Sequence, residues 1–158
     1  DAFVEQGGML VTFSQAGDFA LQELDVPVRN HVAGVWGNDF WAPGATLRIE
    51  VGNTHPLAYG MPDRALATFL AGGQVYETRS GAESSNVHRL ATYPERDILE
   101  SGWLLGEQTI AEKAAIAVVD KGKVASAVTA ALAAATASLG QGGAGGVNKK
   151  KNKVQPAE

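Results

Sequence analysis

The sequence of 158 residues has no cysteine, three histidines and no run of the ~18 consecutive apolar residues that a membrane span needs. Without cysteine there is no disulfide framework, no cysteine-ligated zinc and no thiol nucleophile. The first residues also lack the basic stretch and the apolar stretch of a secretory signal peptide. The sequence therefore predicts no membrane span, and it leaves the compartment unknown.

Positive charge is scarce in most of the chain. Residues 1–139 contain 9 Lys and Arg against 16 Asp and Glu, whereas residues 140–158 contain four Lys and one Glu. Phosphate groups are bound mainly by clustered lysine and arginine. The acidic body therefore argues against a nucleic-acid partner.

Short apolar runs alternate with turn signals along the first 120 residues. We expect helices at 19–24, 64–70 and 107–112, strands at 9–13, 46–51, 74–78, 86–93 and 114–119, and an apolar loop at 98–106. The continuous apolar run at 9–13 is typical of a strand covered on both faces, as in a parallel sheet. We therefore expect an α/β fold with an incomplete, mostly parallel sheet flanked by helices.

The C-terminal third carries two conflicting signals. The run Asp120-Lys121-Gly122-Lys123 has hairpin-turn chemistry, which predicts a partner strand. However, eight of the seventeen residues from 123 to 139 are alanine, and their apolar neighbours share one helical stripe. We expect three parts: a partial α/β domain at 1–123, an Ala-rich helix at 124–139, and a disordered Gly/Lys tail at 140–158.

Several segments resemble the region that follows the catalytic domain in bacterial zinc carboxypeptidases, which are carboxypeptidase A-like metallopeptidases. The most specific are residues 55–62, His-Pro-Leu-Ala-Tyr-Gly-Met-Pro, and residues 101–107, Ser-Gly-Trp-Leu-Leu-Gly-Glu. The resemblance covers about residues 1–123. In those proteins this region looks like a glutamine-amidotransferase-type or flavodoxin-like α/β domain.

The resemblance implies that the chain is a non-catalytic accessory fragment of a zinc metallocarboxypeptidase-like protein. By resemblance, the parent protein hydrolyses C-terminal peptide bonds and holds zinc in an upstream peptidase domain. That domain is the expected partner of this segment, and the resemblance favours an exported bacterial protein. Ala2, Phe3 and Val4, closed by Gly7, are typical of the last turn of a helix. This start also leads us to expect a piece of a longer chain.

The peptidase chemistry itself is missing from these residues. A zinc site of that family needs an H-x-x-E pair and a distant histidine, but His31, His55 and His88 are followed three positions later by Gly34, Ala58 and Ala91. No zinc ligand or catalytic glutamate can be carried over. We therefore predict no catalytic residue, metal site or cofactor in this segment, with zinc in the parent alone, and whether the protein is an enzyme stays open.

Aromatic residues supply an alternative function. Trp36, Phe40, Trp41 and Tyr59 are candidates for a platform that binds a sugar or a peptide, because aromatic side chains are favoured at binding surfaces. Such residues also commonly fix irregular loops to a core. The alternative is therefore a stand-alone ligand-binding α/β module that uses this aromatic loop.

Two polar positions support weaker hypotheses. Ser14 lies between a predicted strand and helix, where the nucleophile of α/β hydrolases stands, but its neighbours Thr-Phe-Ser-Gln-Ala lack the glycines of G-x-S-x-G. His55 precedes Pro56, and we expect its ring to bond a loop carbonyl. Neither position predicts a complete catalytic site.

Overall fold

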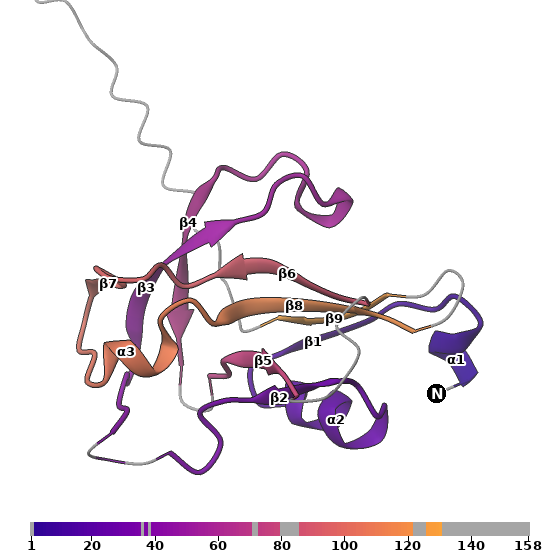
Figure 1. Cartoon of the computed structure of the whole chain (residues 1–158), viewed down its shortest axis with the longest axis horizontal. Coiled ribbons are helices and arrows are strands. Elements are labelled where there is room, and N and C mark those ends of the chain that lie inside the picture. The colour runs from indigo at the N-terminus through magenta and orange to yellow at the C-terminus, as the bar shows by residue number, and fades with distance from the viewer. Residues whose placement is uncertain are drawn as a thin grey trace, which may run out of the picture.

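The computed structural model describes residues 2–35, 37, 39–70, 73–79, 86–121 and 126–130. The helices are α1 (Ala2–Glu5), α2 (Ala16–Glu23), the 3-10 helix η1 (Pro56–Ala58) and α3 (Glu107–Ile110). The strands are β1 (Leu10–Phe13), β2 (Val28–Asn30), β3 (Ala45–Val51), β4 (Arg64–Phe69), β5 (Tyr76–Thr78), β6 (Val87–Thr92), β7 (Leu99–Ser101), β8 (Ala114–Asp120) and β9 (Ser126–Ala130). All of these strands belong to one sheet (Figure 1).

The sheet is mostly antiparallel. Its main order is β1-β9-β8-β6-β3-β4, with β5 pairing β2 and β8, and β7 pairing β3. Among the described strand pairs, β1 with β9 is parallel and the others are antiparallel. The expected mostly parallel, amidotransferase-like sheet flanked by helices is therefore wrong. Parallel neighbours need long crossover connections, usually helical, and the described chain joins most of its strands by hairpins and short loops instead.

Residues 64–70 show why the helical crossovers are missing. We expected a helix there, but Arg64–Phe69 is strand β4, paired with β3 from Glu50↔Arg64 to Ala45↔Phe69. Alternate residues of β4 enter the core, with Ala67 3% and Phe69 8% exposed. Cross-strand pairing and burial override the helical preference of alanine and leucine.

The Ala-rich segment behaves in the same way where it is described. Residues 126–130, inside the expected helix 124–139, form strand β9 between β1 and β8, with Asp120 opposite Ser126. The helix prediction is wrong for these residues, and the turn chemistry that begins at Asp120 was the better signal. Residues 131–139 and the expected tail 140–158 lie outside the described residues.

The hydrophobic core has two main parts. One cluster lies beneath β3 and β4 and includes Leu47, Ile49 and Phe69. The other lies between α2 and the sheet and includes Ala20 and Leu24. Strand β8 is buried along nearly its whole length, as its apolar sequence predicted.

Candidate functional site

The structure separates the four aromatic residues that the sequence grouped. Trp36 lies outside the described residues. Phe40 is 6% exposed and packs edge-on against Phe69, with ring centroids 5.4 Å apart, so it belongs to the core. Trp41 precedes β3 and Tyr59 follows it, and seven strand residues span about 20 Å. Trp41 and Tyr59 therefore do not form one platform.

Trp41 instead lies beside residues that sequence reasoning had placed in an apolar loop. Its backbone N–H donates to the Leu105 carbonyl at 3.1 Å, and the Leu105 N–H donates to the Trp41 carbonyl at 2.8 Å. Residues directly paired in an antiparallel bridge point to the same side. Trp103, two residues before Leu105, is 69% exposed, while Leu104 between them packs against the core.

Three exposed apolar side chains come from these two bridged segments, and we call them the tryptophan surface: Trp41, Trp103 and Leu105. On the first segment Phe40 and Ala42 are buried on either side of Trp41. The segment that carries Trp103 and Leu105 joins β7 to α3, two elements that lie at the same end of the sheet in Figure 1. Exposed tryptophan is costly in water, so these two indoles are candidates for a binding surface.

Glycine fixes the backbone under the tryptophan surface. Gly106 has φ +75°, and a Cβ atom there would collide with the carbonyl of Asp39. The left-handed turn at Gly106 lets the chain pass close to Asp39 and then enter α3, whose Ile110 is fully buried. The surface is therefore preorganised by packing below it.

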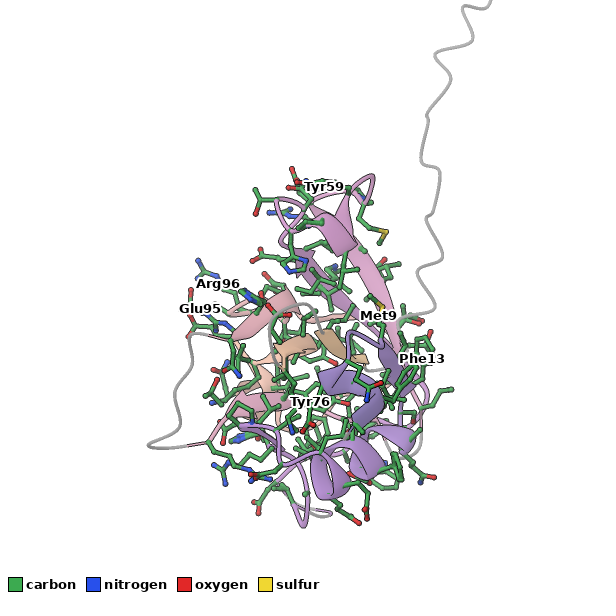
Figure 2. The ribbon with its side chains drawn as sticks, turned by 90° about the vertical axis from the view of Figure 1, so that its right-hand side faces the viewer. Met9, Phe13, Tyr59, Tyr76, Glu95 and Arg96 are labelled. Carbon is green, nitrogen blue, oxygen red and sulfur yellow. The ribbon has the colours of Figure 1, made fainter. Side chains whose placement is uncertain are left out.

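The opposite part of the sheet carries a second apolar surface. Met9, Val11 and Phe13 are 49%, 45% and 49% exposed, and we call them the β1 face. Figure 2 shows Met9 and Phe13 on the same side of the molecule. The expectation that this strand is covered on both faces is wrong, because α2 packs on one face only (Figure 1).

The polarity of β1 is inverted. Thr12 is 5% exposed, and its hydroxyl has no hydrogen-bond partner among the described residues. Its apolar neighbours Val11 and Phe13 lie in water. A strand at the surface ordinarily places the hydroxyl outside and the apolar groups inside. This inversion makes the β1 face a candidate docking surface.

The histidines lie in two separate places. His31 Nδ1 is 3.0 Å from the Glu77 carboxylate. His55 and His88 have ring centroids 5.3 Å apart, and His88 Nε2 is 3.1 Å from Asp120. Within the part of the chain that the structure describes, no group of three or more His, Cys, Asp or Glu is arranged to hold a metal ion.

His55 holds its own loop. Its ring Nδ1 accepts a hydrogen bond from the Leu57 N–H at 3.3 Å and so caps η1. The expected partner was a carbonyl, and the observed one is an amide. Tyr59, 69% exposed, lies near the tip of the β3–β4 hairpin, which extends away from the body of the molecule (Figure 2).

Glu77 is the most strongly perturbed carboxylate. It forms ion pairs with Arg29, His31 and Lys113, and its side chain is 16% exposed. Burial raises the pKa of Glu77, but hydrogen bonds from Lys113, His31 and Arg29 outweigh it and lower the pKa to about 2. The carboxylate therefore ties β2, β5 and β8 together as an anion.

Ser14 has the backbone of a strained turn. Its φ of +50° lies in the left-handed region, between the end of β1 and the start of α2. Such outliers occur at functional sites. The imidazole rings lie against Glu77 or against one another.

The described helices are all too short, or not apolar enough, to cross a bilayer.

No family model and no curated protein matches the sequence. A ThuA-like protein from Parabacteroides merdae, known from a crystal structure, matches 82% of this chain and 51% of its own, with 16% sequence identity and a TM-score of 0.48. The chain thus spans about half of that protein's length. At this level of similarity the match assigns no function.

Proposed function

We propose that this chain is a non-catalytic accessory domain of a larger hydrolase and that the β1 face packs against another folded unit of that protein. The main support for this proposal is the inverted polarity of β1, where Val11 and Phe13 are exposed to water while Thr12 is buried. Natural edge strands are normally protected by charge, proline or a bulge, and β1 has no charged residue or proline. Covering each half-exposed apolar side chain would stabilise the assembly by about 1 kcal/mol.

The resemblance supports a zinc metallocarboxypeptidase-like parent. Two sequence runs are the basis of this resemblance. Residues 55–62 lie at the tip of the β3–β4 hairpin, and residues 101–107 include part of the tryptophan surface and the start of α3. We propose that the partner of the β1 face is the upstream peptidase domain of the same chain. In that parent, the peptidase domain holds the zinc.

The first test is the coding sequence on both sides of this segment. An H-x-x-E pair with a later histidine upstream supports the peptidase parent, and its absence there removes that assignment. The second test is copurification of this chain with the separately expressed upstream domain. We expect Val11→Glu to abolish copurification and Leu57→Glu to preserve it, because Leu57 has similar exposure, 42%, but lies on the distant hairpin. Equal recovery of both variants would rule out docking through the β1 face.

A second function is favoured by the tryptophan surface. Two exposed indoles on one preorganised face suit a ligand-binding module, the alternative that the aromatic loop suggested. Tryptophan fluorescence titrated with a panel of peptides and glycans tests it. A saturable change that is lost in Trp41→Ala and Trp103→Ala, but kept in Tyr59→Ala, supports binding. A flat response to the whole panel eliminates this function.

A further inference from the structure

The surroundings of the tryptophan surface are acidic. Residues 39–42 and 99–107, which carry its three side chains, contain three carboxylates, Asp39, Glu100 and Glu107, and no lysine or arginine. Asp39 is exposed and stands two residues before Trp41.

Arg48 does not offset this charge for a ligand. Its guanidinium is 2.6 Å from the Glu100 carboxylate and donates to the carbonyls of Asp97 and Leu99 at 2.6 and 2.7 Å. These bonds hold β7 against β3. The guanidinium is thereby directed to the protein's own oxygen atoms, and an anionic ligand would meet mainly carboxylates.

Charge and aromatic character together select the ligand class. The face of an indole attracts a cation, and the methylene stem of lysine or arginine packs well on apolar surface. We infer that the tryptophan surface binds a peptide segment that carries lysine or arginine, with the cationic group over Trp41 or Trp103. This inference rests on the binding function proposed above and names its ligand.

The experiment compares peptides that differ in charge alone. The full chain is titrated with acetyl-(Lys-Gly)₄-amide, with the same peptide bearing acetylated lysines, and with acetyl-(Glu-Gly)₄-amide, while tryptophan fluorescence is followed. Because the sequence carries its own lysines at 149, 150, 151 and 153, the titration is repeated with those four changed to glutamine. We expect the lysine peptide to bind at least about fivefold more tightly than the acetylated one.

Variants then locate the binding. Trp41→Ala and Trp103→Ala should weaken binding of the lysine peptide by about fivefold or more, and Asp39→Asn by a few-fold. Tyr59→Ala should leave binding unchanged. Circular dichroism verifies that each variant is folded, and Trp103→Phe, which keeps a ring, should retain most of the affinity.

The outcomes separate this inference from the function on which it rests. Equal binding of the lysine and acetyl-lysine peptides overturns the cationic ligand and leaves the tryptophan surface as a binding site. Binding that ignores both tryptophan substitutions overturns the site. Failure of every peptide and glycan to bind overturns the binding function itself.

Discussion

The tryptophan surface and the β1 face both leave large apolar side chains in water, but on different backbones. The tryptophan surface lies over a packed core, with a two-way backbone bridge between Trp41 and Leu105 and a glycine turn at Gly106. Asp39, Glu100 and Glu107 lie in the segments that carry it. The β1 face is uncharged and lies on a strand with a buried threonine hydroxyl that has no hydrogen-bond partner among the described residues. We therefore propose two roles for exposed apolar area, recognition of a ligand at the tryptophan surface and docking of another folded unit at the β1 face.

Among the substitutions that test this comparison, Gly106→Ala should have the largest effect on stability. The added Cβ collides with the Asp39 carbonyl and the residue must keep a positive φ, so we expect a loss of at least about 3 kcal/mol in unfolding free energy. Urea unfolding measures it. The control is Gly60→Ala, where φ is +86° but nothing lies within 4 Å, and about 1 kcal/mol should be lost. Equal losses would show that steric support below the tryptophans is unimportant.

Glu77 joins the strands between the two regions. Its folded pKa of about 2 lies below its ordinary value of 4.5, so its stabilisation is complete above about pH 4.5 and is lost as pH falls towards 2. We expect Glu77→Gln to lower the unfolding free energy by about 2 kcal/mol at pH 7.

The difference between Glu77→Gln and wild type should shrink steadily as urea unfolding is repeated below pH 4.5. Glu23→Gln, at an exposed position on α2, is the matched control and should change little. A Glu77→Gln deficit that is constant from pH 7 to pH 3 would contradict the ion-pair explanation.

Thr12→Val tests the inverted polarity of β1. Replacing a buried hydroxyl that has no partner in the described part of the chain with a methyl group should stabilise the protein by about 1 kcal/mol. Thermal unfolding measures the change. Thr46→Val, on a partly exposed position of β3, is the control and should have a smaller effect. Destabilisation by Thr12→Val would indicate that the hydroxyl has a partner.

The smallest effect is expected at the tryptophan surface itself. Trp103 is 69% exposed, so Trp103→Ala should change the unfolding free energy by no more than about 0.5 kcal/mol. By contrast, Phe40→Ala, one residue before Trp41, should cost about 3–5 kcal/mol because Phe40 is buried against Phe69. A large loss at Trp103 would mean that this indole is structural.

Local patterns in the sequence predicted several elements correctly. The helix end at Ala2–Val4 is α1, closed by Gly7 with φ +99°, and the buried strand at 114–119 is β8. These elements depend on composition and on one glycine. Strand β4 could not be predicted in this way, because alanine and leucine favour helix locally and the strand state depends on pairing with β3. For β9 the hairpin-turn chemistry at Asp120 did predict a strand, but the alanine content of the following residues favoured a helix.

The candidate site was half predictable. Trp41 was named, but Trp103 was assigned to an apolar loop because the alternation of Trp103, Leu104 and Leu105 becomes visible only beside Trp41. The grouping with Tyr59 failed because β3 separates the two residues. An apolar run such as 10–13 also gives no sign that one face of the strand is left in water.

The parallel pairing of β1 with β9 governs how this protein is made. Leu10 lies opposite Ala127, so β1 cannot pair with β9 until β9 has been synthesised. At a synthesis rate of about 5–20 residues per second, β1 leaves the ribosome roughly ten seconds before β9 is complete. During that interval its apolar side chains are available to chaperones or to other nascent chains. Sheet assembly of such long range is slow, and we expect the yield of folded protein to depend on chaperone supply during translation.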